Sequence, residues 1–439
     1  MSILERARKY EDYVISMRRR FHEEPELSGA EFKTLEKIDA ELTAMGLEHE
    51  EVPNGGIAAF IRGGKAERDA AGRAGRTVLL RADMDALPVE EQQNLNGTRQ
   101  CFSKIPGAMH ACGHDGHTAM LLGAAKILDE MKAELAGDVV LCFERSEETR
   151  TPAGARYIWK WLADKGIEPD SCYGTHVFSN LDSGIVGIND GPMMSGISRF
   201  DITITGKGGH GSRPDQSNNP IDCFVMIYQR MEALRLLKND PFKSVTVSVG
   251  KLQSGMQINV IPESVSFGGT VRFFDMEESH KFMDAFRETI DGCAALCGCR
   301  VDYDVFEDPF YISTVNDPAM AQFARRVINE DFGDGSAQPC EPWMASETFG
   351  GYLAMWPGVI CLLGVRSEEK GSGAAHHNGK FDLDESVLIK GSAAAAVYAF
   401  RFLAEGGAIA DGRKGGKLSL EELLIANRDD EARLEFFGK

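Results

Sequence analysis

Apolar positions in the first half of the chain switch repeatedly between the spacing of a helix and that of a strand. Residues 116–135 carry apolar side chains three and four positions apart, which predicts an amphipathic helix. Helical spacing also marks residues 35–45, and compact apolar runs at 56–61, 77–81 and 139–143 predict buried strands. This alternation predicts an α/β fold with a mostly parallel sheet, helices on both faces, and ligands beyond the carboxyl ends of the strands.

The pattern changes between residues 198 and 308. Strand-like segments at 200–204, 244–249, 265–273 and 301–305 and helical segments at 221–237 and 276–297 follow the order β-α-β-β-α-β, which is ferredoxin-like. We therefore expect an inserted satellite domain at 198–308, a larger domain split between 1–197 and 309–406, and a C-terminal extension at 407–439. Ser419 and Glu422 match a capping box and predict a short helix in that extension.

Composition and charge narrow the class of protein. The length of 439 residues exceeds one ordinary core and agrees with two domains. The 48 Lys and Arg against 67 Asp and Glu give a formal net charge of −19, which argues against nucleic acid or an anionic membrane as a partner. The longest nearly apolar stretch, 354–365, is shorter than the about 20 residues that span a bilayer. With no apolar signal segment at the N-terminus, we expect a cytoplasmic protein whose 10 cysteines are mostly buried thiols.

Three places carry residue types that bind metal ions or transfer protons. Cys112 and His114 lie in a glycine-bearing turn before a predicted helix, and an extended Cys-x-His turn lets both side chains reach one ion. Glu147 and Glu148 follow the strand at 139–143, where one carboxylate can bind the ion while the other transfers protons. His176 lies in a further strand pattern. Simpler interpretations exist for each place: polar caps of a helix, a solvated acidic turn, and a histidine of the core.

Further motifs run in one order along nearly the whole chain. They are Arg19-Arg20-Phe21-His22-Glu23-Glu24-Pro25-Glu26-Leu27, Leu80-Arg81-Ala82-Asp83-Met84-Asp85-Ala86-Leu87-Pro88, Gly206-Lys207-Gly208-Gly209-His210-Gly211, Asn259-Val260-Ile261-Pro262, Gly269-Thr270-Val271-Arg272, Ser346-Glu347 and His377 with Phe381-Asp382. With the Cys112 segment, they resemble metal-dependent N-acyl-amino-acid amidohydrolases of the hippurate hydrolase and auxin-conjugate (IAA-amino acid) hydrolase type, within the aminoacylase and carboxypeptidase G superfamily. The resemblance implies a zinc-peptidase-like α/β domain with an inserted satellite domain.

The resemblance also implies roles for the matched residues. The family's metal ligands, which hold one or two divalent ions, correspond to Cys112, His114, Glu148, His176 and His377. Glu147 corresponds to the general base, and Asp85 to the carboxylate that orients a ligand. Asn259 and Arg272 correspond to residues that bind the carboxylate or the developing oxyanion of the substrate. His210 corresponds to a histidine that relatives lend to the active site of the partner subunit, which implies a homodimer or homotetramer formed through the satellite domain.

The sequence departs from the family pattern at three places. Where relatives usually have Phe-Gln-Pro-Ala-Glu-Glu, this chain has Phe143-Glu144-Arg145-Ser146-Glu147-Glu148. The run Ser346-Glu347-Thr348-Phe349 replaces Ser-Glu-Asp-Phe, and Ser212-Arg213-Pro214-Asp215 replaces a small residue followed by Met, Pro and His. These changes leave the acyl preference open, and Arg213 predicts contact with an acidic group on the substrate. Of the pair His376 and His377, the spacing to Asp382 favours His377 as the ligand.

We therefore predict a metallopeptidase-like hydrolase that cleaves the amide bond of small N-acyl or N-aminoacyl amino acids. A thiolate together with imidazoles favours zinc, with manganese or cobalt as alternatives. The alternative enzymatic interpretation is a dipeptidase or aminopeptidase-like activity on free dipeptides, and the non-enzymatic one is a catalytically silent binding protein of the same fold. Cys293, Cys297 and Cys299 lack a fourth ligand nearby, so we expect core thiols there rather than a zinc cluster.

Overall fold

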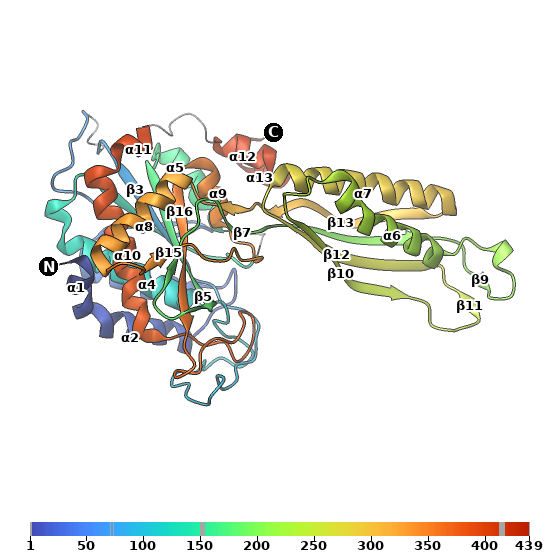
Figure 1. Cartoon of the computed structure of the whole chain (residues 1–439), viewed down its shortest axis with the longest axis horizontal. Helices are drawn as coiled ribbons and strands as arrows, with labels where there is room; N and C mark the ends of the chain where they lie inside the picture. Colours follow the sequence, from blue (N-terminus) through green and yellow to red (C-terminus); the bar gives the residue numbers. More distant parts are fainter. Residues whose placement is uncertain (1, 71, 73, 150–153, 412–417, 439) are drawn as a thin grey trace.

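The structure is a computed structural model that describes residues 2–70, 72, 74–149, 154–411 and 418–438. A larger domain carries an eight-stranded sheet, and an elongated satellite domain with a four-stranded sheet projects from it (Figure 1). The larger sheet has the order β1-β2-β4-β3-β5-β16-β6-β15. Its strands are β1 (Glu48–Val52), β2 (Gly56–Ile61), β3 (Thr77–Asp83), β4 (Asp138–Glu144), β5 (Ser171–Asp182), β6 (Val186–Gly187), β15 (Ala337–Gln338) and β16 (Gly358–Arg366).

Strand direction differs between the centre and the edges of this sheet. The central strands β4, β3, β5 and β16 run parallel to one another. Antiparallel pairs join β1 to β2, β2 to β4, and β6 to β16. The three residues between β1 and β2 are too few for a crossover, so this pair forms a hairpin. The sheet is therefore mixed, and the predicted parallel arrangement describes its centre.

Helices cover both faces because each strand buries alternate side chains on opposite sides. In β4, Val139 and Leu141 belong to one apolar cluster, whereas Val140 and Cys142 belong to the other. The first cluster is completed by α1 (Ile3–Ala7), α2 (Glu11–Glu23), α3 (Phe32–Met45), α4 (His114–Glu130), α8 (Pro318–Phe332) and α10 (Leu388–Glu405), and the second by α5 (Gly154–Lys165), α9 (Phe349–Met355), α12 (Leu420–Ala426) and α13 (Asp430–Phe437). The α/β layers expected from the sequence are confirmed.

The satellite domain has the ferredoxin-like order of elements. Its sheet runs β10-β12-β8-β13 with every neighbouring pair antiparallel, and two helices pack on it. The elements are β8 (Gly196–Thr205), α6 (Pro220–Lys238), β10 (Val245–Ser254), β12 (Ser264–Phe273), α7 (Met276–Cys297) and β13 (Arg300–Tyr311). A small ribbon of β9 (Gly209–His210) and β11 (Val260–Ile261) lies at the end of this domain farthest from the larger sheet (Figure 1).

Shorter elements complete the chain. Strands β7 (Pro192–Met194) and β14 (Thr314–Val315) pair with each other, α11 (Gly407–Asp411) follows α10, and 3-10 turns lie at Arg8–Tyr10, Lys132–Glu134, Pro214–Gln216 and Glu385–Val387. The segment Glu385–Glu405 is long and apolar enough to cross a membrane, but most of it is buried among other elements of the protein. The capping box predicted at Ser419 and Glu422 is present and begins α12, whose Leu423 and Leu424 are buried.

Candidate metal centre

The candidate centre lies where three parallel strands end. Strands β4, β3 and β5 are neighbours, so their carboxyl ends meet at one edge of the sheet. Asp85 follows β3, Glu147 and Glu148 follow β4, and His176 lies within β5. The order of the strands therefore collects side chains from distant parts of the sequence at one place.

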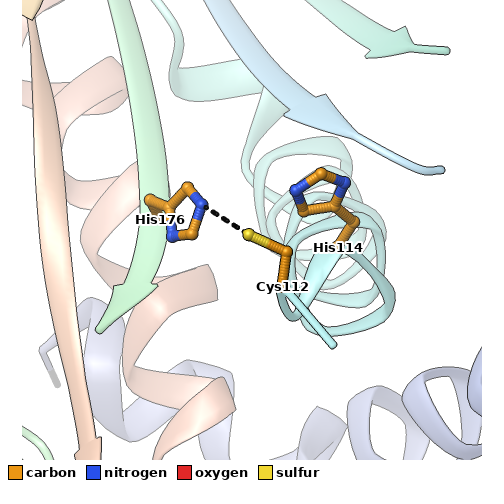
Figure 2. Close-up of side chains that lie close together, drawn as sticks. All are labelled: Cys112, His114 and His176. Atoms are coloured by element: carbon orange, nitrogen blue, oxygen red, sulfur yellow. Dashed lines mark hydrogen bonds between the residues drawn. The ribbon is translucent and has the colours of Figure 1, made fainter. Parts of the chain in front are cut away.

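Gly113 allows helix α4 to begin against strand β5. Its φ of 92° lies in the left-handed region, and a Cβ atom there would come within 2.4 Å of a methyl carbon of Val177. This close approach places the Cys112 Sγ 3.6 Å from the Nε2 of His176 (Figure 2). The Nδ1 of His176 hydrogen-bonds the carbonyl oxygen of Val177 at 2.7 Å, which orients its Nε2 toward the thiol. Burial and the neighbouring His117 hold the pKa of His176 well below its usual range, so the imidazole is neutral, as metal binding requires.

Asp85 orients two of the predicted ligands. One of its oxygens lies 3.0 Å from the Nδ1 of His114, and the other accepts the backbone N–H of Glu148 at 2.9 Å and the hydroxyl of Ser28 at 2.5 Å. Although burial opposes the charge, these hydrogen bonds hold the pKa of Asp85 below its usual range. The Nε2 of His114 is buried and has no hydrogen-bond partner among the described residues. This arrangement is typical of a histidine that binds an ion through one nitrogen and is held through the other.

His377, and not His376, faces the other ligands. The Nε2 of His377 lies 3.2 Å from a carboxylate oxygen of Glu148, and its backbone N–H donates to the carbonyl oxygen of Ala111 at 2.9 Å. The φ of His377 is 59°, in the left-handed region that costs a residue with a side chain free energy and that occurs often at functional sites. His376 instead accepts the backbone N–H of Ser179 at 3.2 Å and packs among aromatic rings.

The donor atoms fit a divalent metal ion. The thiol of Cys112 lies within 4.8 Å of nitrogens of His114 and His176, and it also forms such a group with Glu148 and His377. Burial, reinforced by Glu148, raises the pKa of the Cys112 thiol well above its usual range, so a thiolate here needs a cation beside it. All five predicted ligands thus come together in two overlapping groups.

Another histidine of the same segment is satisfied without an ion. The Nδ1 of His117 lies 2.6 Å from a carboxylate oxygen of Asp83, and its Nε2 accepts the backbone N–H of Val177 at 2.9 Å. Because both ring nitrogens are occupied, His117 has a structural role: it fixes α4 between β3 and β5.

Glu147 lies beside the ligands and is held from two sides. Its Oε1 accepts the backbone N–H of Thr348 at 3.0 Å, and its carbonyl oxygen accepts the hydroxyl of Tyr311 at 2.8 Å. Burial, with the nearby carboxylates of Glu347 and Glu148, raises the pKa of Glu147 well above its usual range. A raised pKa suits a group that accepts and returns a proton near neutral pH.

The predicted substrate-binding residues fall into two groups. Arg272 is half-buried and donates to the hydroxyl of Ser346 at 2.8 Å, two residues before the Thr348 that contacts Glu147. His210 lies in β9 of the ribbon at the far end of the satellite domain, and Asn259 directly precedes β11 of the same ribbon, where its carbonyl oxygen accepts the N–H of Gly211. The structure of one chain therefore does not bring these two residues to the candidate centre (Figure 1).

Arg213 lies in the same part of the satellite domain and already has an anionic partner. Its guanidinium donates to both oxygens of the exposed carboxylate of Asp215, at 2.9 and 2.7 Å. Contact between Arg213 and an acidic group of the substrate stays a prediction.

Two buried polar clusters near the centre were not foreseen from the sequence. His22 lies between the carboxylates of Asp115 and Glu91, at 2.7 Å from each, and Arg18 donates to Asp115 at 2.8 Å. A second cluster surrounds Arg81. Both clusters contain residues of the family motifs, but the motifs alone do not predict which charged side chains contact one another in the folded chain.

Known proteins share the sequence and the fold of this chain. Residues 79–400 match the family described as Peptidase family M20/M25/M40. Over 398 residues the chain is 34% identical to thermostable carboxypeptidase 1 of Saccharolobus solfataricus, covering 90% of this chain and 96% of that one. Over 399 residues it is 35% identical to an IAA-amino acid hydrolase of Arabidopsis thaliana, covering 90% and 86%. The crystal structure of a dinuclear metal-binding peptidase of Bacillus subtilis, from the M20 family, is similar with a TM-score of 0.73 and 31% identity, covering 90% and 99%.

These matches establish the family. The chain belongs to Peptidase family M20/M25/M40, and the resemblance inferred from its motifs is confirmed. It is a hydrolase that acts on amide bonds, and its clustered donor groups are those of a divalent-metal site.

Proposed function

We propose that this chain hydrolyses the amide bond of small N-acyl or N-aminoacyl amino acids and releases the free amino acid. The observation that carries the proposal is the buried carboxyl group of Glu147, which lies within 4.8 Å of donor atoms of His114 and Glu148. A proton-transferring group at the edge of a metal-binding cluster is what hydrolysis of an unactivated amide requires. The relatives named carboxypeptidase and IAA-amino acid hydrolase support a substrate that contains an amino acid.

The proposed metal ligands are Cys112, His114, Glu148, His176 and His377. Zinc is the first choice of ion because a thiolate with imidazoles suits it, and manganese and cobalt are the alternatives to test. When bound, a divalent ion supplies Lewis-acid chemistry, since it polarises a carbonyl group and lowers the pKa of water.

Glu147 is proposed to act as the general base and then as the general acid. Its Oε1 is fixed by the Thr348 N–H, which leaves Oε2 to accept a proton from the attacking water. The raised pKa of Glu147 lets the same group return that proton to the nitrogen of the departing amino acid.

Arg272 is proposed to bind the α-carboxylate of the substrate. It is the guanidinium of the satellite domain that contacts the segment beside Glu147, through Ser346. A guanidinium recognises a planar carboxylate through two parallel hydrogen bonds, which would set the distance from the carboxylate to the scissile amide.

The working unit is proposed to be at least a dimer formed through the satellite domain, with His210 and Asn259 completing the partner's site. Helix α6 supports this pairing because several of its apolar side chains are exposed rather than buried against the satellite sheet. Ile221, Val225, Tyr228, Leu236 and Leu237 are exposed on it. Strand β10 pairs with β12 alone among the strands that the structure describes, so it is an edge of the satellite sheet that a second chain can extend.

A substrate panel tests the proposed function. Acetyl, benzoyl, indoleacetyl and aminoacyl conjugates of several amino acids would be assayed beside free dipeptides, with added zinc, manganese or cobalt. We expect turnover of N-acyl amino acids with at least one of these ions. Preferential cleavage of free dipeptides would favour a dipeptidase, and binding without turnover of any substrate would favour a silent binding protein.

A further inference from the structure

A buried cluster of charged side chains lies next to Glu147. At its centre is Arg81 of β3, whose Nε and Nη2 each lie 2.9 Å from a carboxylate oxygen of Glu144. The Nη1 of Arg81 lies 2.6 Å from Asp83 and 3.0 Å from Glu347. One guanidinium thus faces three carboxylates, and all four side chains are buried.

Thr348 joins this cluster to Glu147. Its hydroxyl accepts a hydrogen bond from the Arg81 Nη2 at 2.7 Å and donates to the Glu144 Oε1 at 2.6 Å. Its backbone N–H donates to the Glu147 Oε1 at 3.0 Å. The same residue therefore contacts Glu144 through its side chain and Glu147 through its main chain, so the position of one carboxylate constrains the other.

The carboxylate of Glu144 accepts more hydrogen bonds than the side-chain amide of a glutamine at that position could accept. Its two oxygens accept four hydrogen bonds, from two nitrogens of Arg81 and from the hydroxyls of Thr348 and Tyr352. A glutamine would offer a single acceptor oxygen and would turn an NH2 group toward one of these donors. The carboxylate is thus required by the groups that surround it in this chain.

Two of the positions that depart from the family pattern, 144 and 348, are in contact here. The family pattern that the motifs resemble has Gln at the position of Glu144 and Asp at the position of Thr348, so each arrangement contains one carboxylate. Because the two side chains lie 2.6 Å apart beside Arg81, exchanging the carboxylate between them keeps the charge around Arg81 constant.

We propose that Glu144 is a positioning residue for Glu147 and that positions 144 and 348 act as one charged unit, in which the carboxylate can stand at either position. The carboxylate anchors Arg81 and the Thr348 hydroxyl, and the Thr348 N–H then holds the Glu147 Oε1. This inference rests on the proposed function of Glu147 as the base.

A cycle of four proteins tests the inference: wild type, Glu144→Gln, Thr348→Asp and the double variant. We expect Glu144→Gln to lower kcat about 10- to 100-fold with little change in KM or metal content, because a misplaced base slows the chemical step. Thr348→Asp should also lower kcat, since it adds a fourth carboxylate to the three that are buried around Arg81. The double variant should return to within about threefold of wild-type kcat, since neighbouring substitutions of this kind are not additive.

Asp138→Asn is the matched control, because Asp138 is a buried carboxylate at the other end of β4 that is paired with Arg62 and Arg68. It should lower the Tm and leave kcat unchanged. A double variant no faster than the slower single variant, or single variants that lose Tm but keep kcat, would overturn the inference. An inactive wild-type enzyme would overturn the proposed function itself, whereas an active wild type without recovery in the double variant refutes only the charged unit.

Discussion

The Sγ of Cys112 lies 3.6 Å from the Nε2 of His176, although 64 residues separate them in the sequence. Cys112 should therefore be a metal ligand, whereas Cys293, buried on α7, should not. We expect Cys112→Ala to lower the bound metal per chain, measured by elemental analysis, and Cys293→Ala to leave it unchanged. A coordinated thiolate is occupied, so a chelator should also expose Cys112 to alkylation. Equal labelling with and without the ion would contradict ligation.

Glu147→Gln should abolish turnover and retain the metal. The substitution keeps the size of the side chain but removes its ability to accept a proton, and positioned proton transfer contributes about 10²- to 10⁴-fold to kcat. Single-turnover rates and metal content would be measured on the same preparation. Near wild-type kcat would contradict the role of Glu147 as the base, and loss of the metal would show that the roles of Glu147 and Glu148 are exchanged.

Substrates should need a free α-carboxylate that Arg272 binds. A hydrogen bond to a charged group contributes about 1.5 to 3 kcal/mol, so amidation of that carboxylate should lower kcat/KM about 10- to 100-fold. Arg272→Gln should lower kcat/KM for the acid by a similar factor and remove the preference for acid over amide. A wild-type enzyme that cleaves acid and amide equally well would contradict this role.

Mixing two inactive variants, His210→Ala and Glu147→Gln, should restore activity if subunits exchange. A hybrid dimer then contains one site with an intact Glu147 from one chain and an intact His210 from the other. In that site His210 can donate a hydrogen bond to the oxyanion, and one such donor can contribute about 10²- to 10³-fold to kcat. Exchange would be followed with differently tagged chains. Proven exchange without recovery would place His210 in the site of its own chain.

The stability that His22 provides should decrease as the pH rises. Burial and Arg18 oppose its charge, but Asp115 and Glu91 outweigh them and raise the pKa of His22. A group with a raised folded-state pKa stabilises fully below its unfolded pKa of about 6.5, and this contribution is lost as the pH rises through the folded value. His22→Gln should therefore cost about 1 to 3 kcal/mol near pH 6 and less near pH 9. Urea unfolding at both pH values would measure the difference, and an equal cost would contradict the charged state.

Sequence periodicity identified the helices and strands that position the ligands, and α7 occurs at the predicted residues Met276–Cys297. Asp85, His114 and Glu148 could be predicted as site residues because their motifs occur in the order of the family that they resemble. Periodicity could not reveal that Glu144 contacts Thr348, since 204 residues separate them and only the fold places the start of α9 beside the end of β4. Similarly, His117 has the same sequence signal as His114, and only its two hydrogen bonds distinguish the structural histidine from the predicted ligand.

The carboxylates that are buried around Arg81 also affect the stability of the folded protein. Asp83, Glu144, Glu347 and Glu147 are buried close together, and burial with the neighbouring carboxylates raises the pKa of Glu147 and of Glu347, although Arg81 opposes the shift of Glu347. An ion that binds only the folded chain adds about 4 kcal/mol of stability when its free concentration is a thousand times its Kd. A low concentration of that ion would then reduce the amount of folded protein as well as the catalytic rate of each folded molecule. The availability of the metal would therefore control both the abundance and the activity of the enzyme.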